Sequence, residues 1–303
     1  MRNFANCVSS IFIRNVNCKM DFMHNVLAHY GFEKSSYTIE KFGSGLINDT
    51  CVVKNGKGKY ILQKVNHKVF TDPFLIADNI EKIEAYLAKT KSDYFFTIPH
   101  YTLNGDSMLQ IDGSYYRVFP FVKNSHTIDV VQTPAQAFEA AKQFGKFTKV
   151  LSGIDIATLN ITLPNFHDLG LRYTQFLMAL ENGNRERQIE VADLIAQLKK
   201  HSDIVEEYQK IKDSAEFKLR VTHHDTKISN VLFDDNNLGV CVIDLDTVMP
   251  GYFISDVGDM MRTYLCPVSE EEEDVSKIEI RDDFYFAIVE GYKTFMESEL
   301  TET

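Results

Sequence analysis

The sequence predicts an α+β protein with two lobes, a small β-rich lobe followed by a larger, mainly helical lobe. Between residues 37 and 122, short β-branched and aromatic runs alternate with turns that contain Gly and Asn, and one helical segment interrupts them. Beyond residue 122, apolar residues recur mostly at helical spacing and over longer segments. We therefore expect an N-lobe over residues 20–122 and a C-lobe over residues 123–303, preceded by a disordered extension over residues 1–19.

Local patterns place the elements of the N-lobe. The runs YTIEKF, TCVVK and KYILQKV predict strands within residues 37–65, and NGKG predicts a tight hairpin because Asn and Gly tolerate positive φ. Two further strands are expected around residues 108–111 and 115–122. Between the two groups, Pro73 opens a helical segment whose apolar face is formed by Ile76, Ile80, Ile83 and Leu87.

The C-lobe begins with a helix that carries its own start signal. Thr133 is a typical N-cap residue and Pro134 suits the first helical position, so we expect a helix to about Val150. Long helical patterns follow over residues 168–182 and 187–211. Two short apolar runs, NVLFD and GVCVID, then predict a pair of strands before helical sequence resumes.

Composition argues against several classes of protein. The 303 residues carry 32 Lys and Arg against 43 Asp and Glu, and the net charge of −11 argues against a general binder of nucleic acid or acidic membranes. Five widely spaced cysteines without a Cys-x-x-Cys pair argue against a disulfide framework or a zinc site, and indicate a cytoplasmic protein. We expect neither a signal peptide nor a membrane span, since no apolar run approaches roughly 20 residues.

The segment VTHHDTKISNVLFD, followed by GVCVIDLDTVMPG, carries the chemically informative residues. His223 and Asp225 form a His-x-Asp pair, Asn230 opens the first apolar run, and Asp244 follows the second. Two short strands joined by a turn would bring Asn230 and Asp244 together, and hard oxygen ligands of this kind suit Mg²⁺. Asp225 is then placed to accept the proton of an attacking hydroxyl.

This spacing, H-x-D-x-x-x-x-N followed by a metal-binding Asp, resembles that of the protein-kinase-like phosphotransferases, especially their aminoglycoside-phosphotransferase branch. The segments FGSGLINDTCVVK, YILQKVNHKVFTDP, IDLDTVMPG and SDVGDMMR further resemble the N-acetylhexosamine 1-kinase group of that superfamily. The resemblance implies a protein-kinase-like two-lobe fold. It also implies transfer of phosphate from ATP, with Mg²⁺, to the anomeric hydroxyl of N-acetylglucosamine or N-acetylgalactosamine.

Individual residues receive expected roles from this pattern and this resemblance. The catalytic residues are Asp225 and Lys227, the metal ligands are Asn230 and Asp244, and the structural residues are His223 and Asp256. The nucleotide site is expected to contain Gly43, Ser44, Gly45, Asn48, Lys64 and Phe121. The sugar contacts are expected to be Arg117, His167 and Arg172.

The cation for the α- and β-phosphates leaves alternatives open. In the kinase fold this cation comes from the third strand, where the candidate is Lys64. Gln63 precedes it, and a register shift of one residue would exchange the faces of the two side chains. The carboxylate that pairs with the cation is either Glu81 or Glu84.

The acceptor leaves alternatives open as well. One is a kinase of another small hydroxyl compound, such as an aminoglycoside, choline or homoserine, and another is a non-catalytic nucleotide-binding protein. The resembling proteins continue for several dozen residues beyond the equivalent of Thr303, so we expect this chain to lack the family's C-terminal helices. The resemblance implies a small-molecule sugar and ATP as partners; we expect neither nucleic acid nor membrane, and the oligomeric state is left open.

Overall fold

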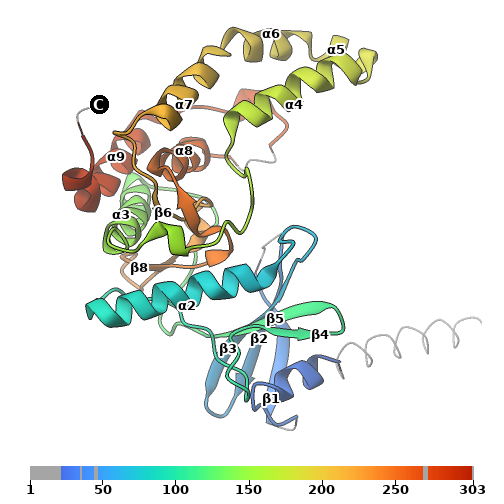
Figure 1. Cartoon of the computed structure of the whole chain (residues 1–303), viewed down its shortest axis with the longest axis vertical. Helices are drawn as coiled ribbons and strands as arrows, with labels where there is room; N and C mark the ends of the chain where they lie inside the picture. The colour runs from blue at the N-terminus through green and yellow to red at the C-terminus, as the bar shows by residue number, and fades with distance from the viewer. Residues whose placement is uncertain (1–21, 35, 44–46, 269–271, 302–303) are drawn as a thin grey trace, which may run out of the picture.

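A five-stranded antiparallel sheet builds the small lobe, which lies at one end of the molecule (Figure 1). Asn55 pairs with Gly58 at the NGKG turn, which confirms the predicted hairpin. The computed structural model describes residues 22–34, 36–43, 47–268 and 272–301, so the predicted extension over residues 1–19 lies outside the described residues. In sheet order, the strands are β1 (Tyr37–Lys41), β2 (Asp49–Asn55), β3 (Gly58–Val65), β5 (Ser114–Pro120) and β4 (Leu109–Ile111).

Helix α2 (Pro73–Thr90) lies between the sheet and the helical lobe (Figure 1). Its predicted apolar face is confirmed, because Ile76, Ile80, Ile83 and Leu87 are all buried. They join a core that continues into the helical lobe. The two lobes therefore share one core across α2.

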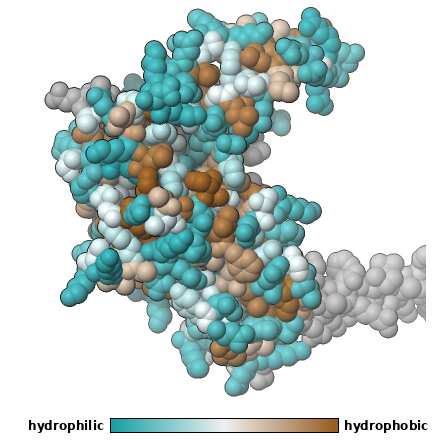
Figure 2. All heavy atoms as spheres, viewed as in Figure 1, coloured by the Kyte–Doolittle hydropathy of each residue, from teal (hydrophilic) through white to brown (hydrophobic). Residues whose placement is uncertain are grey.

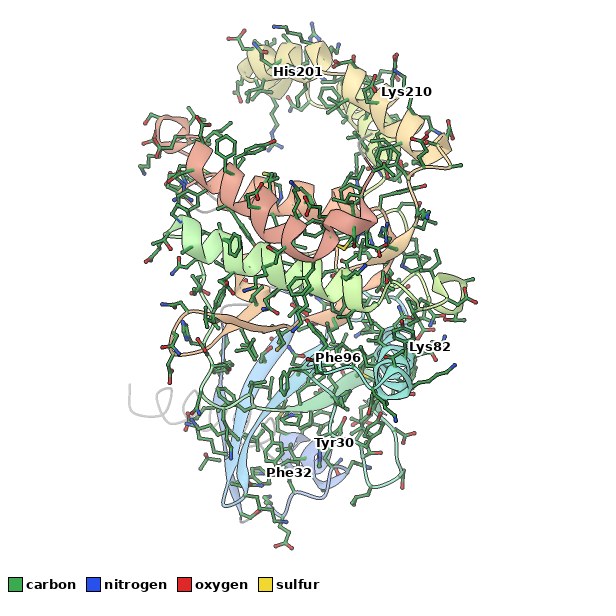
Figure 3. All side chains as sticks on the ribbon, turned by 90° about the vertical axis from the view of Figure 1, so that its left-hand side faces the viewer. Tyr30, Phe32, Lys82, Phe96, His201 and Lys210 are labelled. Atoms are coloured by element: carbon green, nitrogen blue, oxygen red, sulfur yellow. The ribbon has the colours of Figure 1, made fainter. Side chains whose placement is uncertain are left out.

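The opposite face of the sheet has a smaller core of its own. The helical residues 22–28 place Val26 and Leu27 against it, where both are fully buried. The Tyr30 hydroxyl donates to the carbonyl oxygen of Tyr116 over 2.8 Å. Figure 3 shows Tyr30 and Phe32 at this end of the molecule. Both faces of the sheet are thus covered.

Helix α3 (Pro134–Val150) packs closely against α9 (Asp282–Met296) in the helical lobe. The predicted N-cap of α3 is confirmed, because the Thr133 hydroxyl accepts from the backbone of Gln136 in a capping box. Glycine makes the close approach possible, since a Cβ on Gly291 would lie 2.3 Å from the carbonyl oxygen of Phe138. α3 therefore packs against α9 and also contacts β8 (Gly239–Val242).

The helical pattern predicted over residues 187–211 is present, but it is divided among separate helices. After α4 (Leu169–Asn182), this segment forms three helices, α5 (Arg185–Glu190), α6 (Ala192–Lys200) and α7 (Asp203–Asp213). The breaks let α7 turn back along α4, where the Tyr208 hydroxyl donates to the carbonyl oxygen of His167. An unbroken helix of that length would point about 37 Å into solvent at 1.5 Å per residue. α4–α7 project from the body, with His201 at the far end (Figures 1 and 3).

Two small antiparallel hairpins lie between the sheet and the C-terminal helices. β7 (Val231–Phe233) pairs with β8 (Gly239–Val242), which confirms the predicted pair of strands, and β6 (Arg220–Thr222) pairs with β9 (Met249–Gly251). Helix α8 (Phe253–Tyr264) follows directly after β9. In the described part of the chain, every helix is too short or too polar to cross a bilayer.

Candidate active site

The loop between β6 and β7 carries the His-x-Asp motif, and side chains of α8 hydrogen-bond to its backbone. Asp256, on the first turn of α8, accepts hydrogen bonds from the backbone N–H groups of His223 (3.0 Å) and His224 (2.7 Å). Burial raises the pKa of Asp256 to about 6, although both hydrogen bonds act to lower it. The Asp256 carboxylate therefore fixes the backbone immediately before Asp225.

A second acid of α8 holds the other side of Asp225. The Asp259 carboxylate accepts from the backbone N–H of Thr226 (2.7 Å) and from the guanidinium of Arg262 (2.8 Å). The Tyr264 hydroxyl donates to the carbonyl oxygen of Thr226 (2.6 Å). Sequence reasoning missed Asp259 and Tyr264, although the spacing of Asp259 from Asp256 places both acids on one face of a helix.

The two histidines of the motif have buried side chains that connect neighbouring elements. His223 donates from Nε2 to the carbonyl oxygen of Ile243 (2.9 Å) and packs edge-on against Phe144. The His224 ring stacks on His167 with 5.3 Å between centroids, and burial lowers its pKa to about 3. These contacts join the loop to the β7–β8 hairpin and to the segment that precedes α4.

The β7–β8 hairpin brings Asn230 and Asp244 together, as predicted. Val231 pairs with Val242, and the Ile243 N–H donates to the carbonyl oxygen of Asn230 over 2.9 Å. The Asn230 side-chain amide donates to the Asp225 carboxylate (3.1 Å). Asp225, Asn230 and Asp244 thus converge at one end of the hairpin.

Asp244 lies close to two other carboxylates, and its pKa is shifted. Crowding by the surrounding protein atoms, together with the neighbouring carboxylates Asp246 and Asp225, raises the pKa of Asp244 to about 7, although its side chain is open to solvent. Because the Asn230 amide nitrogen faces Asp225, its side-chain oxygen is available to a cation. No cluster of three or more His, Cys, Asp or Glu with metal-binding geometry occurs among the described residues. A carboxylate and an amide oxygen fit Mg²⁺, which takes few protein ligands and balances the negative charge of neighbouring carboxylates.

A hollow between the lobes opens above this carboxylate cluster, and we call it the interlobe hollow. The residues that line it come from the small lobe, the segment after β5 and the β7–β8 hairpin, whereas the broader concave side visible in Figure 2 lies between the projecting helices and the small lobe. Phe121 lies at the interlobe hollow, edge-on to Phe42 with 6.1 Å between ring centroids. The apolar walls of the interlobe hollow suit a flat aromatic ring, and the polar residues Asn230 and Asp244 lie at its floor. The lining includes Ile61, Gln63, Arg117, Phe119, Leu232, Asn230, Ile243 and Asp244.

The predicted phosphate loop borders the same hollow. Gly43 has φ of 79°, a conformation that favours glycine, while Ser44 and Gly45 lie outside the described residues. Asn48 donates from its side chain to Asp246 (2.8 Å) and accepts from the backbone N–H of Asn66 (3.0 Å). Asn48 therefore ties the end of this loop to the helical lobe.

Comparison with known proteins agrees with this geometry. A model of the phosphotransferase enzyme family, APH, matches residues 38–284. This chain belongs to the APH phosphotransferase family. The predicted family is thereby confirmed, whereas the comparisons do not show that the chain is an N-acetylhexosamine kinase.

Three solved structures share the fold of this phosphotransferase at low sequence identity. The aminoglycoside phosphotransferase from Alicyclobacillus acidocaldarius has 11% identity and a TM-score of 0.56, and the match covers 86% of this chain and 76% of that one. The spectinomycin phosphotransferase APH(9)-Ia, solved with ADP and spectinomycin, has 16% identity, a TM-score of 0.53 and coverages of 91% and 79%. A microcompartment-associated aminopropanol kinase has 14% identity, a TM-score of 0.51 and coverages of 93% and 90%. The predicted kinase-like two-lobe fold is confirmed.

The structure does not bring Lys64 of the phosphotransferase to the interlobe hollow. Its Nζ lies over the ring of Tyr116, 5.9 Å from the centroid, on the face of the sheet that packs against residues 22–28. Gln63, one position earlier, lines the hollow instead, because side chains alternate along a strand. The position of Lys64 therefore contradicts the prediction that it is the phosphate-binding cation.

The two glutamates considered as partners of Lys64 make other contacts. Glu81 accepts from the Ser107 hydroxyl, and Glu84 accepts from the Tyr101 hydroxyl over 2.9 Å. Among the described residues, no ion pair joins either glutamate to Lys64. The ion pair expected from the kinase fold is thus not made by these residues.

The predicted sugar contacts lie in two different places. His167 and Arg172 line a second hollow, which we call the α8 hollow, together with Tyr208, Asp259 and Arg262. His167 donates from Nε2 to the carbonyl oxygen of His224 (2.9 Å), so this hollow borders the loop that carries Asp225. Arg117 instead lines the interlobe hollow.

Lys227, predicted as catalytic, lies on the same loop as Asp225. Its positive charge lowers the pKa of Asp244, against the larger raising effects of desolvation and of the neighbouring carboxylates. Lys227 therefore lies within electrostatic reach of the carboxylate cluster at the floor of the interlobe hollow.

Proposed function

We propose that this phosphotransferase uses ATP and Mg²⁺ to phosphorylate the anomeric hydroxyl of an N-acetylhexosamine, giving the sugar 1-phosphate. The observation that carries the proposal is the convergence of Asp225, Asn230 and Asp244 beneath the interlobe hollow. Family membership supports phosphoryl transfer, and the sequence segments given above support the acceptor. Use of ATP also supports the predicted cytoplasmic location.

Asp225 is the proposed general base. Its carboxylate accepts the proton of the attacking hydroxyl and holds that hydroxyl in line with the γ-phosphoryl group. The hydrogen bond from Asn230 and the anchoring of His223, His224 and Thr226 by α8 fix the position of this carboxylate. Lys227 stabilises negative charge on the transferred group.

Asn230 and Asp244 are the proposed ligands of Mg²⁺. The bound ion neutralises charge on the β- and γ-phosphates. Asp244 contributes the anionic oxygen, and Asn230 contributes its amide oxygen while its nitrogen holds Asp225. One side chain thereby aligns the metal site with the general base.

The adenine ring is proposed to occupy the apolar part of the interlobe hollow, beside Phe119 and Phe121. The segment with Gly43 and Asn48 then covers the phosphates. Support comes from APH(9)-Ia, which has this fold and was solved with ADP.

The α8 hollow is the proposed acceptor site, and its charges favour an uncharged sugar over an organic cation. Arg172 and Arg262 line it, and the Asp259 carboxylate is already engaged by Arg262 and Thr226. Among the described lining residues, no other carboxylate is present to attract an ammonium group. Aminoglycosides, choline and other amines are therefore the less favoured acceptors.

The test is phosphate transfer from labelled ATP with Mg²⁺ to N-acetylglucosamine and N-acetylgalactosamine, beside kanamycin, choline and homoserine. We expect a sugar 1-phosphate, identified by ³¹P NMR. Asp225→Asn should lower the rate by about 10²-fold or more while MgATP still binds. Asp235→Asn, an exposed residue of the β7–β8 turn, is the matched control and should keep the wild-type rate.

Two results would contradict the proposal. Turnover of the amines without turnover of either sugar would assign the enzyme to the alternative acceptor class. Folded protein that binds MgATP and phosphorylates none of the acceptors would favour a non-catalytic nucleotide-binding protein.

A further inference from the structure

Arg117 lies at the interlobe hollow, where the expected cation, Lys64, is absent. The β3 position that faces the hollow is Gln63, and Lys64 points to the other side of the sheet. In the register of β3 and β5, Arg117 lies directly opposite Gln63. Among the described residues that line the hollow, Arg117 is the one Lys or Arg.

The guanidinium of Arg117 is held in a defined orientation. Its Nε donates to the side-chain oxygen of Gln63 (3.0 Å), and its Nη1 forms an ion pair with Asp246 (2.5 Å). The side chains of Arg117 and Asp246 are 2% and 4% exposed. Removing both charges from water is costly, so a buried pair of this kind is weak evidence for a role in stability. Its position beside Asp244 points to a role in the site.

Asp246 connects the two lobes through this pair. It lies two residues after Asp244 in the helical lobe, and it accepts from Arg117 of β5 and from Asn48, the residue before β2. Both donors belong to the small lobe. A single carboxylate of the helical lobe therefore orients the cation and the end of the phosphate loop together.

We propose that Arg117 is the residue that binds the nucleotide phosphates in this phosphotransferase, and that Asp246 is its positioning residue. The proposal rests on the proposed use of ATP. A guanidinium has five N–H donors in a planar fork, so it can hold Gln63 and Asp246 and still donate to a phosphate oxygen. The pair Arg117–Asp246 thus takes over the task that a third-strand lysine and a helix glutamate perform in the kinase fold.

The assignment separates Arg117 from the sugar contacts predicted with it. His167 and Arg172 line the α8 hollow, whereas Arg117 faces Asp244 and Asn230 across the interlobe hollow. Its positive charge also lowers the pKa of Asp244, so the two side chains interact electrostatically. Arg117 therefore acts on the nucleotide side of the reaction.

The test compares the binding of MgATP, MgADP and adenosine by titration calorimetry. The variant is Arg117→Met/Asp246→Asn, which removes both charges and leaves no buried ion unpaired. We expect its affinity for MgATP to fall by about tenfold to a hundredfold, since a charge-assisted hydrogen bond is lost. Adenosine, which has no phosphate, should bind the variant and the wild type equally. Lys64→Met is the matched control and should leave all three affinities unchanged.

The outcomes distinguish this proposal from the proposed function. Wild-type protein that binds no MgATP would refute the proposed function itself. Wild-type affinity for MgATP in the double variant, or the loss appearing in Lys64→Met, would overturn the role of Arg117 alone. A crystal structure of the wild type with MgADP tests the same contact without a variant. It should place the Arg117 guanidinium within hydrogen-bond distance of a phosphate oxygen, and a different cation there would refute the assignment.

Discussion

Replacing Gly291 by alanine should destabilise the protein, because this residue lets α9 lie directly against α3. A Cβ at Gly291 would be 2.3 Å from the carbonyl oxygen of Phe138 and 3.1 Å from the Cβ of Ala141. Neither neighbour is the end of a flexible side chain. The helices must therefore separate, and α3 also carries Phe144, which packs against His223 of the loop between β6 and β7.

The magnitude follows from the size of the overlap. Ordinary contact begins near 3.4 Å, so the two backbones have to move apart by about 1 Å. Overpacking of a close-packed interior costs about 1–3 kcal/mol. Alanine returns up to about 1 kcal/mol through its higher helix propensity. We expect the free energy of unfolding of Gly291→Ala to fall by about 1–2 kcal/mol.

Gly258→Ala provides the matched control, because Gly258 is also helical and no atom lies within 4 Å of its added Cβ. This variant should be as stable as the wild type or more stable by up to about 1 kcal/mol. Urea denaturation measures both free energies of unfolding. If Gly291→Ala is no less stable than Gly258→Ala, the reasoning about close helix packing is refuted.

Two further predictions concern the loop that carries Asp225. Asp259→Ala leaves the buried Thr226 N–H without its acceptor and should cost about 1–3 kcal/mol in urea denaturation. Arg262→Ala removes the half-exposed partner of Asp259 but leaves its hydrogen bond from Thr226, so it should cost less than Asp259→Ala; equal losses would contradict the bracing role. The pKa of His224 falls to about 3 in the native state, so its stabilising contribution is complete above pH 6.5, where the unfolded chain is also neutral. That contribution should be lost by about 1.4 kcal/mol per pH unit as the pH falls from 6.5 towards 3. His224→Gln should lack this slope, so the difference between the unfolding free energies of wild type and variant should change by this amount per pH unit; the same pH dependence in both proteins would disprove it. Asp256, whose raised pKa acts with the opposite sign, contributes equally to both proteins in this comparison.

Features that depend on neighbouring residues could be predicted from the sequence. The NGKG hairpin, the apolar face of α2 and the Thr133 cap all follow from local backbone and packing preferences, and all are present. The meeting of Asn230 and Asp244 was predictable for the same reason, since a short hairpin joins them. The proximity of Asn230 and Asp244 therefore required no knowledge of the fold beyond two adjacent strands.

The breaks between the helices of residues 187–211 could not be predicted from the local pattern. The periodicity over residues 187–211 is helical throughout, yet Val191 interrupts the helix with φ of −114° and ψ of 26°. The contact between Tyr208 and His167 holds α7 back along α4, and this contact joins residues 41 positions apart. Periodicity reports which residues share a face and contains no information on where a helix turns back.

By itself, the sequence determined the strands and hairpins, the helix starts and the His-x-Asp spacing that predicts the phosphotransferase family, because each depends on short-range patterns. Only the tertiary structure decided that Gln63 rather than Lys64 faces the interlobe hollow, and that Arg117 meets Asp246 across 129 positions of the chain. The first depends on strand register, where a shift of one residue reverses every face. The second depends on how two lobes pack, and the free energy of that packing belongs to the shared core rather than to any local segment.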